Sequence, residues 1–159
     1  MQHALLIASL YALLGAPGTL AQTSGQTAPE TPAPPVAPVW TAQDAGLQWG
    51  PCPPFMPEGC AIAVLHGDPA QPNADVFLKV PGGAVIPRHR HTSAERMVLV
   101  SGELRVTYDG QRETVLRPGS YAYGPANLPH LGTCAAGESC VLFIAFESPV
   151  DAMPGAAGE

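Results

Sequence analysis

The sequence predicts an all-β domain with the architecture of a barrel or jelly roll. Apolar and polar residues alternate in several short runs, which is the pattern of half-buried strands. The chain contains 19 prolines and 17 glycines, and these residues punctuate the turns between short strands. No segment shows the apolar repeat of a helix over about ten positions. Short strands joined by many turns favour a closed or two-sheet β architecture.

The strand-like runs can be assigned in chain order. In LRVTY, residues 104–108, the apolar side chains at alternate positions share one face and the polar ones share the other. Asp109-Gly110 follows directly and predicts a two-residue hairpin turn. The last run, CVLFIAF, is apolar on both faces and should be a central, covered strand. The predicted strands are 61–65, 76–80, 96–100, 103–108, 113–117, 120–123 and 140–146.

Length and charge limit the class of partner. A chain of 159 residues corresponds to one domain, with 46% hydrophobic and 13% charged residues. The formal net charge is −6, and all seven basic residues lie between Lys79 and Arg117. Nucleic-acid-binding proteins carry a basic surface. No nucleic-acid partner is therefore expected.

The N-terminal residues have the features of a secretory signal. Residues 4–14, ALLIASLYALL, form an apolar run that is too short to span a bilayer. The small residues that follow fit cleavage after Ala21, although the basic start of a typical signal is missing. The alternative is a buried helix of the domain. We predict a signal peptide over residues 1–21, a secreted or periplasmic protein, and no integral membrane span.

The next segment has the composition of a spacer. Residues 22–39 carry five prolines and no lysine or arginine. Such a segment buries too little apolar surface to offset the entropy of ordering, so a Pro/Ala/Thr-rich linker is expected. The folded domain is predicted over 40–148, followed by a flexible tail at 149–159. Near its start, Phe55 and Met56 either cover the core or line the mouth of a pocket.

Four cysteines occur as two local pairs, Cys52 with Cys60 and Cys134 with Cys140. Four cysteines allow three connectivities, and sequence alone does not choose among them. An exported protein favours disulfides over free thiols, and neither pair has the short spacing typical of a zinc site. We predict the two local bridges, each of which closes a short loop.

The residues with the clearest chemistry lie in the stretch 83–102, GAVIPRHRHTSAERMVLVSG. His89 and His91 are two positions apart, and in a strand such side chains point to the same face. Two imidazoles aimed at one point can bind a metal ion. The polar stretch HTSAE lets the chain turn, which can bring Glu95 back toward the histidines. His130 arrives from a different strand-like run, which allows facial ligation.

This stretch resembles the first motif of the cupin superfamily, G-x5-H-x-H-x3-E-x6-G. The second cupin motif, G-x5-P-x-G-x2-H-x3-N, is matched in part, since Asn127 replaces a glycine and Cys134 replaces an asparagine. Asparagine tolerates the positive φ that a tight turn requires at position 127. The resemblance implies a single cupin-type double-stranded β-helix, or jelly-roll barrel. The residues that match the motifs are Gly83, His89, His91, Glu95, Gly102, Gly119, Pro125 and His130.

The resemblance further implies one divalent transition metal. Three imidazoles and a carboxylate suit manganese, iron, zinc, copper or nickel, and they leave open positions for water, dioxygen or a chelating molecule. Glu95 is predicted to be the fourth ligand and catalytic, with the orientation of another ligand as its alternative role. Because neutral imidazole ligates, affinity should fall as the pH drops through about 6.5. The predicted metal ligands are His89, His91, Glu95 and His130.

Other polar side chains near the motifs have less defined roles. Arg88 and Arg90 alternate with the histidines, so they should point outward as surface charges. Tyr121 and Tyr123 share one face of a strand, which either lines the pocket or lies at the surface. His66 belongs to neither motif and is not expected to bind the metal.

The resemblance does not select a reaction, because cupins include dioxygenases, decarboxylases, isomerases, storage proteins and sensor domains. The first hypothesis is a small oxygenase acting on a chelating phenolic or diketone-like compound. The second is a non-catalytic module that binds a metal or a small ligand. The third is a metal-free structural jelly roll. Since cupins are often dimers, the resemblance also implies a homodimer.

Overall fold

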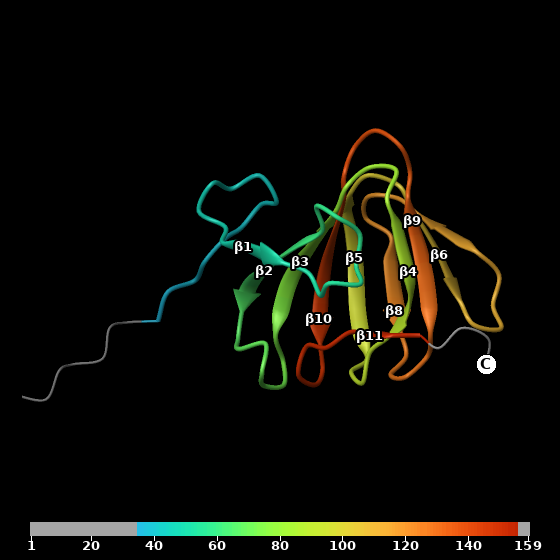
Figure 1. Cartoon of the computed structure of the whole chain (residues 1–159). Helices are drawn as coiled ribbons and strands as arrows, with labels where there is room; N and C mark the ends of the chain where they lie inside the picture. Colours follow the sequence, from blue (N-terminus) through green and yellow to red (C-terminus); the bar gives the residue numbers. More distant parts are fainter. Residues whose placement is uncertain (1–34, 156–159) are drawn as a thin grey trace, which may run out of the picture. The chain divides into compact units, whose positions relative to one another are not determined.

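The computed structural model describes residues 35–155 (Figure 1). The predicted signal peptide at 1–21 and most of the predicted linker lie outside this part. Within it the chain forms eleven β-strands and no helix. The strands are β1 (Trp49–Pro51), β2 (Ala61–His66), β3 (Asp75–Val80), β4 (Val85–Arg90), β5 (Glu95–Ser101), β6 (Leu104–Tyr108), β7 (Thr114–Leu116), β8 (Tyr121–Gly124), β9 (His130–Cys134), β10 (Cys140–Phe146) and β11 (Met153–Pro154).

The strands pair into two antiparallel sheets. One has six strands in the order β1-β2-β3-β10-β5-β8, and the other has five in the order β11-β4-β9-β6-β7. Apolar side chains from both sheets form one core, with Val76 and Leu99 from the first and Ile86 and Val106 from the second. This arrangement confirms the predicted all-β jelly roll. β10 pairs with β3 and β5, so CVLFIAF is the central strand that its sequence indicated.

Two short strands at the margins carry no sequence signal. β1 has three residues and β11 has two, and runs of this length show no periodicity. In β11, Met153 lies opposite Arg90 and Pro154 opposite His89. The segment after residue 148, which was predicted as a tail, therefore contributes a strand to the second sheet. Between residues 35 and 155, no helix is long and apolar enough to cross a membrane.

Asp109-Gly110 forms a turn, but not the predicted two-residue hairpin. The backbone N–H of Gln111 donates to the carbonyl of Tyr108 at 2.9 Å, and Gly110 has a φ of 74°. The ladder between β6 and β7, however, begins only where Val106 faces Thr114. The last residues of β6 pair with β9 instead. The residues between Asp109 and Glu113 are polar without apolar alternation, so they form a loop and do not extend the ladder.

A β-bulge in β4 sets the direction of the first motif histidine. Ile86 pairs with Gly132 and His89 pairs with His130, so β4 has one more residue than β9 between these pairs. The extra residue reverses the inside–outside alternation, and Ile86 and His89 are both buried although they lie three positions apart. Pro87, which has no N–H to donate to a ladder, occupies the bulge.

The outer face of the larger sheet is covered by the segment that precedes β1. Leu47 from this segment packs with Ala63, Phe77 and Val141 in a second apolar cluster. The ammonium group of Lys79 lies 4.1 Å from the centroid of the Trp49 ring, a distance at which a cation is attracted to the ring face.

Both predicted disulfides are present. Cys52 is bonded to Cys60 and Cys134 to Cys140, with Cα atoms 5.6 and 5.8 Å apart. The first bridge ties the segment before β2, and the second closes the connection from β9 to β10. All four cysteines of the chain are therefore bonded, as the local pairing predicted.

Candidate metal centre

Three histidines meet in the interior, between the two sheets. His89 lies on β4, His91 follows that strand directly, and His130 begins β9. All are buried, and one ring nitrogen of each lies within 4.8 Å of the others. The ring centroid of His89 is 4.2 Å from that of His130 and 4.9 Å from that of His91. The structure thus brings the three motif histidines together.

A backbone carbonyl fixes the orientation of each imidazole. Nδ1 of His89 contacts the carbonyl of Pro87 at 2.8 Å, and Nδ1 of His130 contacts that of Leu128 at 3.2 Å. Nδ1 of His91 contacts the carbonyl of Asp151. Because a carbonyl only accepts, Nδ1 carries the proton and Nε2 keeps its lone pair. This is the tautomer that a metal-binding imidazole needs.

Burial keeps these imidazoles uncharged. It lowers the pKa of His89 to about 4 and, with the neighbouring His89 ring, that of His130 to about 3. Burial also lowers the pKa of His91, against a smaller opposing effect of Asp151. Burial thus moves the competition between protons and a metal at these imidazoles below pH 6.5, the value of exposed histidine on which the sequence prediction rested.

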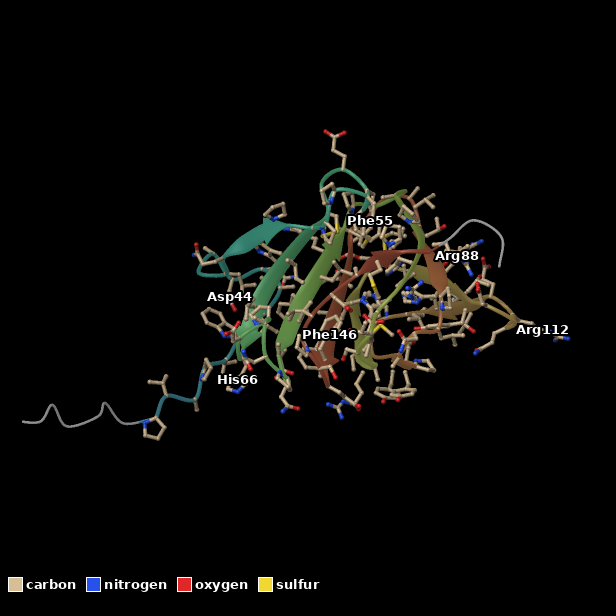
Figure 2. All side chains as sticks on the ribbon, turned by 60° about the horizontal axis from the view of Figure 1, so that its bottom comes forward. Asp44, Phe55, His66, Arg88, Arg112 and Phe146 are labelled. Atoms are coloured by element: carbon tan, nitrogen blue, oxygen red, sulfur yellow. A yellow bond between two sulfur atoms is a disulfide. The ribbon has the colours of Figure 1, made fainter. Side chains whose placement is uncertain are left out.

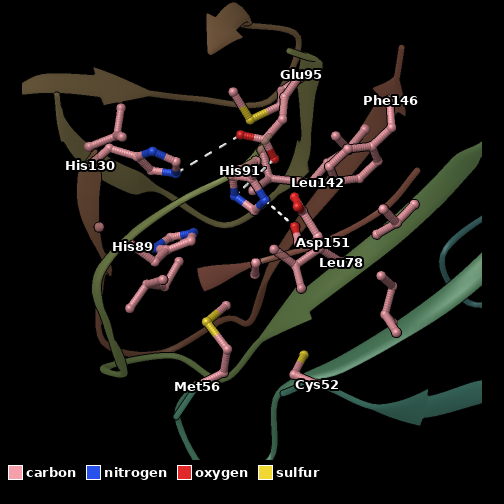
Figure 3. Close-up of a pocket in the computed structure, with 18 of the residues that line it drawn as sticks. Cys52, Met56, Leu78, His89, His91, Glu95, His130, Leu142, Phe146 and Asp151 are labelled. Carbon is pink, nitrogen blue, oxygen red and sulfur yellow. Dashed lines mark hydrogen bonds and ion pairs between the residues drawn. The ribbon is translucent and has the colours of Figure 1, made fainter. Parts of the chain in front are cut away.

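Glu95 begins β5 and turns its carboxyl group toward the histidines (Figure 3). Its Oε1 lies 3.4 Å from Nε2 of His91, and its Oε2 lies 4.0 Å from Nε2 of His130. Burial, with a smaller contribution from the charge of Asp151, raises the pKa of Glu95 to about 8. In the metal-free protein at neutral pH this carboxyl group therefore holds a proton.

The turn between His91 and Glu95 is tied to the end of β10. The buried hydroxyl of Ser93 donates to the carbonyl of Ala94 at 2.7 Å. The same oxygen accepts from the backbone N–H groups of Glu147 and Ser148 at 3.0 and 2.9 Å. These bonds hold the HTSAE turn in the position that points Glu95 inward.

The C-terminal strap, residues 149–155, adds a group that sequence reasoning missed. The carboxylate of Asp151 accepts from the backbone N–H of Thr92 at 2.9 Å and from its hydroxyl at 2.5 Å. The backbone carbonyl of Asp151 accepts from His91. Asp151 lies 60 positions after His91 in the sequence, and no motif marks it. Only the fold reveals that it positions a metal-ligand candidate.

The histidines and Glu95 lie at the wall of a cavity of about 270 Å³. Its lining is mainly apolar and comes from both sheets, from the strap and from the segment before β2, where Met56 and Cys52 contribute (Figure 3). Met56 also packs against the core, so both roles considered for it apply. Among the described residues that line the cavity, none is lysine or arginine.

The remaining sequence candidates lie away from the cavity. Tyr121 and Tyr123 are 62% and 51% exposed and belong to the surface. Arg88 forms an ion pair with Asp109. His66 is exposed, like Arg112, which projects away from the sheets (Figure 2).

The turn before His130 accounts for the departure from the second motif. Asn127 has a φ of 61°, as its place in the motif predicted. Its backbone N–H donates to the carbonyl of His91 at 2.7 Å, which links the two motif segments. Cys134, the other departure, is a disulfide partner.

The donor set fits a divalent transition metal. Three neutral imidazole nitrogens with free lone pairs face one region, and a carboxyl group adjoins it. Imidazole suits zinc, copper, iron and nickel, and the carboxylate adds manganese. The cavity beside these groups leaves space for further ligands, which a closed structural site would lack.

Comparisons with known proteins agree with this architecture. The sequence profile of the cupin domain matches residues 76–146, a stretch that holds both motifs, β4 to β10 and all of β3 except its first residue. No curated protein matches the chain in sequence. The architecture, the paired motifs and this match define a cupin domain. The chain belongs to the cupin superfamily.

Solved structures share the fold at low identity. The DMSP lyase DddQ from Ruegeria pomeroyi is 20% identical with a TM-score of 0.59, over 71% of this chain and 64% of that one. This chain thus spans less than two thirds of the lyase. The polyketide cyclase RemF from Streptomyces resistomycificus is 17% identical with a TM-score of 0.60, over 76% and 88%. An RmlC-like cupin from Ralstonia eutropha is 25% identical with a TM-score of 0.53, over 64% of each chain.

Proposed function

We propose that this cupin binds one divalent transition metal through His89, His91 and His130 and acts as a small oxygenase. Glu95 is its fourth ligand. The observation that carries the proposal is the convergence of three neutral, backbone-oriented imidazoles and one carboxyl group at the wall of an apolar cavity. The substrate is a small organic compound that chelates through oxygen, of a phenolic or diketone-like kind. Dioxygen is the co-substrate, and both of its atoms enter the product.

The protein residues supply geometry and proton control. A bound metal would provide a Lewis acid with open positions for the substrate oxygens and for dioxygen. The carbonyls of Pro87 and Leu128 keep two of the imidazoles in the ligating tautomer. Glu95 releases its proton when it ligates, because only the carboxylate binds a metal. The apolar lining excludes bulk water from the reacting atoms.

Metal content tests the first half of this proposal. The purified mature chain is loaded in turn with manganese, iron, zinc, copper and nickel, and bound metal is measured by elemental analysis. One ion per chain is expected for the wild type and none for His89→Ala or His130→Ala. His66→Ala, a change at an exposed histidine outside the cluster, should bind normally. A wild-type chain that binds none of these metals would refute the proposed metal centre.

Oxygen uptake tests the second half. The metal-loaded chain is assayed with a panel of catechols and β-diketones, and Glu95→Gln should lower turnover more than metal content. Stoichiometric metal without oxygen uptake for any member of the panel would favour the alternative, a non-catalytic cupin that binds a metal or a small ligand. The apolar cavity suits that role as well.

We further infer that the protein is exported to the periplasm or beyond the cell. Two disulfides are typical of oxidising compartments, and residues 1–21 have the features of a cleaved signal. Mass spectrometry of exported material should show a mature chain that begins near Gln22. Recovery of the intact chain from the cytoplasm would contradict export. A homodimer is also proposed, and light scattering at several protein concentrations tests it.

A further inference from the structure

The polarity of the cavity is unevenly distributed. Its polar side chains gather at the metal centre, where the carboxyl groups of Glu95 and Asp151 are its only acidic groups among the described residues. The rest of the lining is aliphatic, aromatic or sulfur-containing; examples from the two sheets are Ile62, Leu78, Ile86, Leu116 and Ile144. Because none of the described lining residues is lysine or arginine, an anionic ligand would find no protein cation there.

Tyr108 is the exception to this distribution. It ends β6, lines the cavity, and its ring centroid lies 4.8 Å from that of His130. The side chain is only 9% exposed, yet its hydroxyl has no hydrogen-bond partner among the residues that the structure describes. A buried hydroxyl without a partner destabilises a protein by about 1–3 kcal/mol. Such a group in a cavity wall therefore points to a ligand.

The hydroxyl of Tyr108 adjoins the metal centre. A methyl group added at Gly124 would lie 2.9 Å from the Tyr108 oxygen and 3.1 Å from Oε2 of Glu95. Both oxygens thus lie beside Gly124 of β8, and they have room there because glycine has no side chain. Burial, with a smaller contribution from the charge of Glu95, raises the pKa of Tyr108. The phenol therefore stays protonated and is a hydrogen-bond donor.

We propose that the cavity takes a small, uncharged and mostly apolar molecule whose oxygen accepts a hydrogen bond from the hydroxyl of Tyr108. The inference rests on the proposed function and concerns the ligand of the same site: the protein groups of the cavity, apart from a bound metal, favour molecules without a permanent charge. The apolar body fills the space between the sheets. The oxygen end lies beside Glu95 and His130, within the region of the metal centre.

The volume sets the size of this ligand. About 270 Å³ is close to the lower end of the range of ligand pockets, which begins at roughly 300 Å³. An apolar cavity of roughly 150 Å³ already accommodates benzene. A single substituted aromatic ring therefore fits this cavity, whereas an oligosaccharide or a peptide does not.

Three probes of similar size test the inference: acetophenone, ethylbenzene and benzoate. Acetophenone has an uncharged oxygen acceptor, ethylbenzene has none, and benzoate carries a charge. Dissociation constants are measured by NMR titration of the mature chain, once in the metal-stripped form and once in the zinc-loaded form. The variants are Tyr108→Phe and, as a control on the exposed surface of β8, Tyr121→Phe.

In the metal-stripped chain, acetophenone and ethylbenzene should both bind, and benzoate should bind at least tenfold more weakly because its charge is buried without a partner. Tyr108→Phe should weaken acetophenone binding about fivefold, the value of one neutral hydrogen bond. It should leave ethylbenzene binding unchanged. The same acetophenone loss is expected with zinc bound, and Tyr121→Phe should change nothing.

Several outcomes would overturn the inference. Equal binding of benzoate and acetophenone to the metal-stripped chain would show that the cavity does not select against charge. An equal effect of Tyr108→Phe on acetophenone and ethylbenzene would show that the hydroxyl does not bind the ligand oxygen. A large loss of thermal stability in Tyr108→Phe would show that its hydroxyl has a structural partner. A chain that binds none of the five metals but shows the Tyr108 effect in acetophenone binding would refute the proposed metalloenzyme and leave this inference standing.

Discussion

Replacement of Glu95 by glutamine should remove a large pH dependence from the stability of the metal-free protein. Burial raises the pKa of Glu95 from 4.5 to about 8 in the folded chain. Between these two pH values the unfolded chain is ionised at this position, whereas the folded chain still holds the proton. The free energy of unfolding contributed by this group is therefore highest below pH 4.5 and falls until the pH passes about 8.

The size of the effect follows from the same shift. Each pH unit in this window changes the free energy of unfolding by about 1.4 kcal/mol. At pH 7 the wild type should have lost roughly 3 kcal/mol relative to pH 4.5 through this one group. Glutamine does not titrate, so the stability of Glu95→Gln relative to the wild type should rise by that amount across the interval.

Urea unfolding followed by tryptophan fluorescence measures this difference. Both proteins are stripped with a chelator and unfolded at unit steps between about pH 5 and 8, the range in which the linkage acts. Glu113→Gln, at an exposed position in the loop between β6 and β7, serves as the matched control and should show no such trend. A gap between Glu95→Gln and the wild type that stays constant with pH would refute the reasoning, since Glu95 would then be ionised in the folded chain.

Three further predictions concern the Cys134–Cys140 disulfide, the proton of Glu95 and Asp151 of the C-terminal strap. Serine at both Cys134 and Cys140 should lower the free energy of unfolding by about 2 kcal/mol in urea; unchanged stability would contradict the bridge. Zinc binding near neutral pH should release one more proton from the wild type than from Glu95→Gln. Calorimetry in buffers of different ionisation enthalpy counts these protons, and equal release would mean that Glu95 does not ligate. Asp151→Ala should weaken zinc affinity about tenfold, because its carboxylate positions the residue after His91; competition with a chelator measures this, and unchanged affinity would exclude that role.

The metal-centre candidates and the disulfides could be predicted because they are local in sequence. His89, His91 and Glu95 lie within one turn and its flanking strands, and each cysteine pair closes a short loop. The spacing of such residues limits where they can lie. Strand alternation placed His89 and His91 on one face, but it did not show which face is buried. The bulge at Pro87, which reverses the alternation in β4, turns His89 inward.

Tyr108 and Asp151 could not be predicted as parts of the site. In the sequence, Tyr108 is one more apolar residue on the inner face of a strand, and the unpartnered state of its hydroxyl depends on every atom packed around it. Asp151 reaches His91 only because β11 pairs with β4, and a two-residue strand has no periodicity. Both depend on contacts between distant segments, which spacing does not encode.

The electrostatics of the centre connect the proposed metal with the proposed ligand class. The same burial lowers the pKa values of His89 and His130 and raises that of Glu95, so these three groups carry no charge in the metal-free protein at neutral pH. Ionised Glu95 supplies one negative charge to a divalent ion, and the imidazoles supply none. The ion and Glu95 together then carry one positive charge, and the carboxylate of Asp151 lies in the same, otherwise mainly apolar, lining. A phenol or diketone enters such a cavity uncharged and can lose one proton on ligation, which brings the complex of metal, Glu95 and ligand to neutrality. A dianionic substrate would instead carry its full desolvation cost into the cavity and leave excess negative charge beside Glu95.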